Sequence, residues 1–130
     1  SLANESWIQF LEAQPFPQMA DLYMTHDVCI LPSHHEPLGS SPVEGMAYGV
    51  VPVISTECGS AGYIRDGFNG VHINMRSTAS LRATLTRLVQ DKALIPTLSK
   101  NALATVGNSL IEEIVIHRIE KLLQGERLLP

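Results

Sequence analysis

Two short apolar segments constrain the fold of this chain more than any other feature. Residues 28–31 and 50–55 contain no charged side chain, and turn-forming residues follow each segment within a few positions. Apolar runs of this length lack the alternation of a half-exposed strand and are typical of strands buried on both faces. Such strands occur in parallel sheets that helices cover on both sides. The sequence therefore predicts an α/β protein.

The signals around these two segments alternate between strand and helix. The expected elements are strands at 7–11, 28–31, 50–55 and 71–73, with helices at 18–25, from 41 to 49, and within 77–89, 96–106 and 109–122. Ser41 is expected to be the N-cap of the second helix, with Pro42 at its first position and Glu44 completing a capping box. This order predicts a partial doubly wound, Rossmann-like parallel sheet.

Composition and charge narrow the class of protein. A chain of 130 residues that is 45% hydrophobic can bury one core and is too apolar to be disordered. No apolar run reaches the roughly 18 residues of a membrane-spanning helix. The two cysteines, Cys29 and Cys58, are too few for a disulfide scaffold, and we expect reduced thiols in a cytoplasmic protein. The net charge of −4, without a basic stripe, argues against nucleic acid as a partner.

The charges are divided unevenly along the chain. Residues 1–64 hold seven acids and no Lys or Arg, and all nine basic residues lie from Arg65 onward. Any phosphate that the first half binds must therefore be held by backbone amides rather than by cationic side chains.

The loop at residues 33–41 lies where open α/β sheets bind their ligands, because it leaves a buried strand and enters a helix. Gly39 permits a ligand to approach the backbone closely. The first amides of the following helix, from Ser41 onward, are expected to form an anion site. Glu36 and Glu44 lie on either side of that site in the sequence.

The residues around this loop resemble a known family in their order. Glu36 and Glu44, with 27–33 upstream and 55–59 and 66–70 downstream, resemble the Glu-x7-Glu signature of retaining, GT-B-fold glycosyltransferases such as glycogen and sucrose synthases. The resemblance runs from about residue 7 to 106. It implies that residues 1–130 are a single-domain fragment, the second half of the C-terminal, nucleotide-sugar-binding domain.

The resemblance also implies a reaction and a role for each loop residue. The protein would transfer a hexose from a nucleotide-diphospho-sugar, with retention, in carbohydrate biosynthesis. Glu36 would be catalytic, beside the anomeric carbon, and Glu44 would accept hydrogen bonds from the ribose hydroxyls. The expected donor-binding residues are His34, Leu38, Gly39, Ser40, Ser41 and Glu44. No metal and no cofactor is expected, and the acceptor is unknown.

Each of these residues also has a simpler interpretation. Glu44 could only complete the capping box, and Glu36 could be a solvated loop acid. The adjacent pair His34-His35 beside Glu36 suggests a metal site, but a third ligand at suitable spacing is missing from the sequence. The alternative function is a non-catalytic nucleotide- or phosphate-binding module, or a structural α/β module, derived from this family.

Two departures from the family pattern limit the expected activity. The family's upstream loop, whose Arg and Lys clamp the diphosphate, has no equivalent in this sequence, so the isolated chain is expected to be inactive. Gly62 stands where the family has a Glu. Without the upstream strands, one edge of the 28–31 strand is expected to be open. A homo-oligomer or the chain's own N-terminal segment would then cover it.

Overall fold

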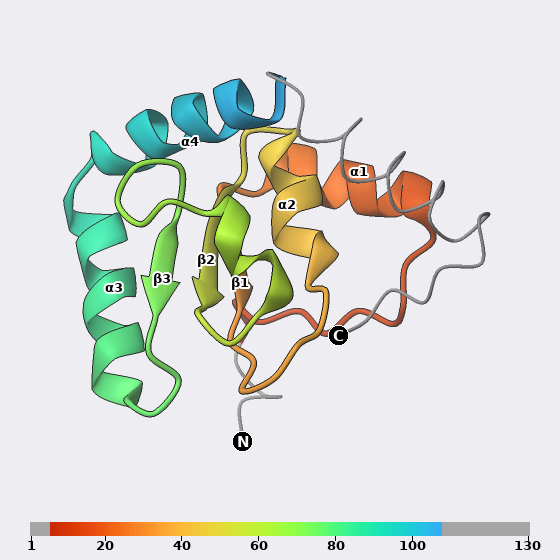
Figure 1. Ribbon diagram of the computed structural model, residues 1–130. Helices are drawn as coiled ribbons and strands as arrows, with labels where there is room; N and C mark the ends of the chain where they lie inside the picture. Colours follow the sequence, from red (N-terminus) through yellow and green to blue (C-terminus); the bar gives the residue numbers. More distant parts are fainter. Residues whose placement is uncertain (1–5, 108–130) are drawn as a thin grey trace, which may run out of the picture.

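The computed structural model describes residues 6–107 and contains one parallel sheet in the order β1-β2-β3 (Figure 1). The elements are α1 (Phe16–Thr25), β1 (Val28–Leu31), α2 (Ser40–Met46), β2 (Val51–Ser55), η2 (Gly59–Tyr63), β3 (Val71–Ile73), α3 (Thr78–Gln90) and α4 (Leu94–Thr105). The predicted α/β fold with a parallel sheet is confirmed. The helix predicted at 109–122 lies outside the described residues.

Each face of the sheet carries its own buried cluster. Val53 of β2 and Ile73 of β3 lie on one face, where they pack with Leu88 of α3 and Leu98 of α4. Ile54 lies on the opposite face and belongs to a second buried cluster. That cluster consists of Met46, Ile54, Cys58, Ile64 and Ala102. The central strand β2 is therefore buried along its whole length, as its sequence predicts.

The helix α4 contributes to both clusters. Leu98 and Ala102, one helical turn apart, are both fully buried, but Leu98 packs with the first cluster and Ala102 with the second. Figure 1 shows α4 across the end of the sheet that is opposite the loop between β1 and α2. The two cores are thus joined through one helix, at a distance from the candidate loop.

The strand predicted at 7–11 is wrong. This segment has no regular structure, and Trp7, Phe10 and Leu11 are exposed by 75%, 73% and 49%. A strand requires a hydrogen-bonded neighbour, and none of the described strands pairs with this segment. Hence the part of the N-terminal segment that the structure describes does not extend the sheet at β1.

β1 is less buried than its apolar sequence predicts. Within the described residues β1 pairs only with β2, and α3 packs beside β3 at the other end of the sheet. Ile30 is consequently 40% exposed. The expectation of a strand buried on both faces is wrong for this residue, and the expected open edge is present in the described sheet.

The start of α2 also differs from its prediction. Gly39 is the N-cap, in the left-handed conformation with φ of 62°, and no side chain caps the helix. Ser41 lies inside the helix, so the capping box of Ser41 and Glu44 is wrong. A glycine takes this conformation without steric cost and turns the chain into the helix one residue earlier.

The helices α1, α3 and α4 begin within two residues of their predicted starts. α1 begins at Phe16 rather than Gln18, because Pro17 suits the first turn of a helix. Ser77 caps α3, its hydroxyl oxygen accepting a hydrogen bond from the Ser80 amide at 3.1 Å. α4 begins at Leu94, so Pro96 lies within its first turn rather than before it.

Candidate functional site

The Glu36 carboxylate shapes the loop between β1 and α2. One of its oxygens, Oε1, accepts hydrogen bonds from the amides of Leu38 and Gly39, each at 3.2 Å. These bonds close a tight turn immediately before α2. Glu36 is therefore more than a solvated loop acid, because its half-buried side chain holds the backbone that leads into the helix.

The residues that follow β2 form backbone contacts with this loop. The Gly59 amide donates to the Glu36 carbonyl oxygen at 2.8 Å, and Glu36 and Cys58 form an isolated parallel bridge. A Cβ atom on Gly59 would overlap the carbonyl oxygen of Pro37. Gly59 thus allows two backbone segments to touch, and this contact fixes the position of the loop relative to the end of β2.

A tyrosine from α1 positions Glu44. The Tyr23 hydroxyl donates to Glu44 Oε2 at 3.2 Å, and the Tyr23 ring stacks on Tyr48 with 5.6 Å between ring centroids. Tyr23 is not among the site residues that the sequence predicts. No local pattern indicates a hydrogen bond between residues 21 positions apart, so this contact could not be found without the structure.

The Glu44 charge acts on two neighbouring groups. Burial first, and then the Glu44 charge, raise the pKa of Tyr23 to about 12, although the Ser41 side chain opposes this change. The same two causes, in the same order, raise the pKa of the Cys29 thiol. Burial also raises the pKa of Cys58. Both cysteines are free thiols, and these shifts keep them protonated and unreactive near neutral pH.

Tyr23 should make the stability of the fold depend on pH in the alkaline range. Above pH 10 the unfolded chain loses the Tyr23 proton, whereas the folded protein keeps it until about pH 12. Unfolding then releases a proton, so the free energy of unfolding should fall as the pH rises from 10 to 12. Urea denaturation across this range should show the fall, and Tyr23→Phe should reduce it. An equally steep fall in the variant would contradict the assignment.

The structure brings some of the predicted site residues together and separates others. Glu36, Leu38 and Gly39 are hydrogen-bonded within one turn, and Glu44 is held from the α1 side. His34, Leu38, Ser40 and Ser41 are exposed on the loop and the first turn of α2. Among the described residues no hydrogen bond joins Glu36 to Glu44. Their shared role therefore needs a ligand between them.

Two expectations about the site change with the structure. Leu38 and Gly39 are expected to bind the donor, but their amides donate to the Glu36 carboxylate in the described structure. α2 has only seven residues, so its dipole is small and an anion at its start would be held mainly by the nearest backbone amides.

Within residues 6–107, no three His, Cys, Asp or Glu side chains lie close enough together to hold a metal ion.

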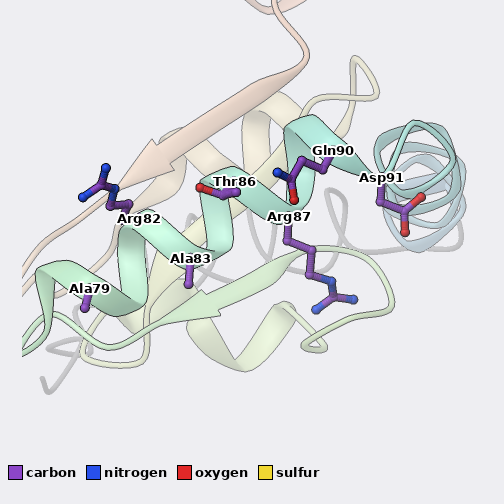
Figure 2. Close-up of a pocket in the computed structure, with 7 residues that line it drawn as sticks. All are labelled: Ala79, Arg82, Ala83, Thr86, Arg87, Gln90 and Asp91. Carbon is purple, nitrogen blue, oxygen red and sulfur yellow. The ribbon is translucent and has the colours of Figure 1, made fainter.

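A shallow surface hollow lies away from this loop, along α3 (Figure 2). All its lining residues belong to α3 and the position that follows it: Ala79, Arg82, Ala83, Thr86, Arg87, Gln90 and Asp91. Figure 2 shows that Arg82 and Arg87 point to different sides and do not converge. The hollow contains none of the predicted residues and does not lie at the carboxyl ends of the strands. The loop before α2 remains the better candidate.

The fold defines a class of protein. Sucrose-phosphate synthase from Thermosynechococcus elongatus superposes with a TM-score of 0.77 over 90% of this chain and 29% of that chain, at 24% identity. The Anabaena protein HepE, solved in complex with UDP-glucose, gives 0.79 over 95% of this chain and 34% of its own, at 22% identity. The chain thus has the Rossmann-like α/β architecture of GT-B glycosyltransferases.

Sequence comparison identifies the family. Residues 1–105 match the family described as "Glycosyl transferases group 1", and the chain belongs to it. A D-inositol 3-phosphate glycosyltransferase of Thermomonospora curvata is 36% identical over 81 residues, which are 62% of this chain and 19% of that protein. The chain therefore spans about a fifth of that relative's length. Separately, no helix in the described part of the chain is both long and apolar enough to cross a bilayer.

Proposed function

We propose that the loop at 33–41 binds a nucleotide-diphospho-sugar and that the chain is the donor-binding half-domain of a retaining glycosyltransferase. The observation that carries the proposal is the turn closed by Glu36. It holds a carboxylate and two backbone amides at the carboxyl end of β1, where open α/β sheets bind ligands. Membership of the group 1 glycosyl transferases supports a transferase activity. The UDP-glucose complex of a protein with the same fold supports a nucleotide sugar as donor.

Glu36 has the chemistry that the transfer step requires. As the bond between sugar and diphosphate breaks, positive charge develops at the anomeric carbon, and a nearby carboxylate stabilises it. Negative charge develops on the departing diphosphate, which backbone amides stabilise. The Glu36 turn supplies both kinds of group, so we assign Glu36 the catalytic role and the surrounding amides the donor contacts.

Glu44 is proposed to hold the ribose of the nucleotide. A carboxylate that accepts from two vicinal hydroxyls makes charge-assisted, directional hydrogen bonds. Tyr23 binds only Oε2 of Glu44 in the described structure, so its hydroxyl fixes the carboxylate orientation from the side of α1. His34, Leu38, Ser40 and Ser41 complete the proposed donor contacts.

Glu44→Gln tests this assignment. The amide oxygen of Gln can still accept the Tyr23 hydrogen bond, but the charge is lost. We expect the affinity of the intact protein for its nucleotide sugar to fall about tenfold or more, because hydrogen bonds to charged groups contribute about 1.5–3 kcal/mol. Calorimetric titration with UDP-glucose, GDP-mannose and ADP-glucose measures the affinity and shows which of these donors is preferred.

Tyr23→Phe is the matched control, since it removes the hydroxyl and keeps the Glu44 charge. Its loss of affinity should be smaller than that of Glu44→Gln. Unchanged affinity in Glu44→Gln, with only a slight change in stability, would contradict the proposal and favour the structural module. Nucleotide binding without sugar transfer in the intact protein would favour the non-catalytic binding module.

The remaining expectations stay predictions. They are a metal-independent reaction without a cofactor, an inactive isolated chain, a cytoplasmic location, and an acceptor that is a sugar, polysaccharide or lipid-linked molecule. Residues 1–130 are proposed to form one domain fragment. The open edge of β1 is proposed as the contact of a homo-oligomer, since the described N-terminal residues do not extend the sheet there.

A further inference from the structure

Ser60 has a buried hydroxyl for which the described structure provides no partner. The residue is 2% exposed, and its Oγ is the one buried side-chain polar atom among the described residues that makes no hydrogen bond. Burying a hydroxyl without a hydrogen bond is unfavourable, so such groups in native proteins call for a specific explanation. Ser60 is the second residue of η2, next to the Gly59 that supports the candidate loop.

The surroundings of Ser60 point to Glu36. A Cβ atom built on Gly39 would lie 3.1 Å from Ser60 Oγ, 3.2 Å from Glu36 Cγ and 2.9 Å from Leu31 Cδ2. The missing side chain of Gly39 therefore leaves a small space that the Ser60 hydroxyl and the Glu36 side chain both border. Glu36 is thus a neighbour of this hydroxyl across the space that Gly39 leaves open.

A ligand gives Glu36 a reason to make that change. In the described structure the carboxylate accepts hydrogen bonds from the Leu38 and Gly39 amides. A phosphate or sugar oxygen that takes these amides displaces the carboxylate and leaves it without two hydrogen bonds. The displaced carboxylate then needs another donor inside a partly buried site, because an unpaired charge there is costly.

We propose that Ser60 is a positioning residue for Glu36. When the donor occupies the Leu38 and Gly39 amides, the Ser60 hydroxyl donates to the Glu36 carboxylate and holds it beside the sugar. This inference rests on the proposed function, since it requires a ligand at the loop. It also accounts for the unpaired Ser60 hydroxyl, since the Glu36 carboxylate accepts from the Leu38 and Gly39 amides in the described structure.

Ser60→Ala tests the inference through stability and ligand affinity, which the substitution should affect differently. In the free protein the substitution removes no hydrogen bond, so the denaturation midpoint should be unchanged or higher. The affinity for UDP-glucose, or for whichever nucleotide sugar the wild type prefers, should fall about tenfold. Ser55→Ala is the control: Ser55 is equally buried, but its hydroxyl oxygen accepts from the Glu57 amide at 3.1 Å. That variant should lose stability instead.

A double-mutant cycle with Glu36→Gln separates positioning from a general structural effect. If Ser60 acts through the Glu36 carboxylate, Ser60→Ala should have a much smaller effect on affinity in the Glu36→Gln background. An equal loss in both backgrounds would overturn the inference, as would unchanged affinity in Ser60→Ala alone. If the wild type binds none of the nucleotide sugars, the proposed function fails, and this inference fails with it.

Discussion

Gly59→Ala should disrupt the candidate donor site, whereas Gly62→Ala in the same short helix should leave it intact. A Cβ atom at position 59 would overlap the Pro37 carbonyl oxygen, and backbone cannot move aside as a flexible side chain can. The loop must then move away from η2 and lose the hydrogen bond from the Gly59 amide to the Glu36 carbonyl oxygen. At Gly62 an added Cβ meets no atom within 4 Å.

The effects on stability and on binding should both be large. Forcing an extra methyl group into a packed contact costs about 1–3 kcal/mol, and Gly59→Ala should lie at the upper end of that range in urea denaturation. Its affinity for the nucleotide sugar should fall tenfold or more, because the displaced loop no longer holds Glu36 in its position. Gly62→Ala should match the wild type in both measurements. Equal behaviour of the two variants would show that the loop does not rest on η2.

Leu98→Ala should be among the most destabilising substitutions in α4. Leu98 is fully buried between α4 and the sheet, and replacing a buried leucine with alanine costs about 2–5 kcal/mol through lost apolar contact and the cavity that remains. Leu103→Ala is the matched control on the same helix. Leu103 is 45% exposed, so its loss should cost less than about 1 kcal/mol.

Urea denaturation of the two variants measures this difference directly. Leu98 and Leu103 are both leucines within the helix predicted at 96–106, so the sequence alone does not rank them. A cost for Leu103→Ala as large as that for Leu98→Ala would mean that another surface covers this side of α4.

The described strands were predictable from local pattern. β1, β2 and β3 occur within one residue of their expected bounds, because short apolar runs flanked by turn-forming residues favour buried strands. Residues 7–11 show the limit of such reasoning. Their apolar pattern suits a strand, but a strand also depends on a partner far away in the sequence, and local pattern contains no information about that partner.

The candidate site was predictable in its location and less so in its contacts. The Gly39 loop and its two acids could be selected from spacing and resemblance. The start of α2 was placed wrongly because Ser41 and Glu44 fit a capping rule that the left-handed Gly39 makes unnecessary. Tyr23 and Ser60 were missed, since each acts through a residue brought near only by folding.

The two-sided packing of α4 bears on how the chain folds during its synthesis. One turn of α4 supplies a buried side chain to each face of the sheet, Leu98 to one and Ala102 to the other. The apolar cluster on either face therefore lacks a member until the ribosome has released the residues around Ala102. Nascent chains that end before this helix expose apolar strands and depend on chaperones or on late release. A stop codon or frameshift shortly before residue 98 should therefore abolish the fold, although every residue of the candidate loop has already been translated.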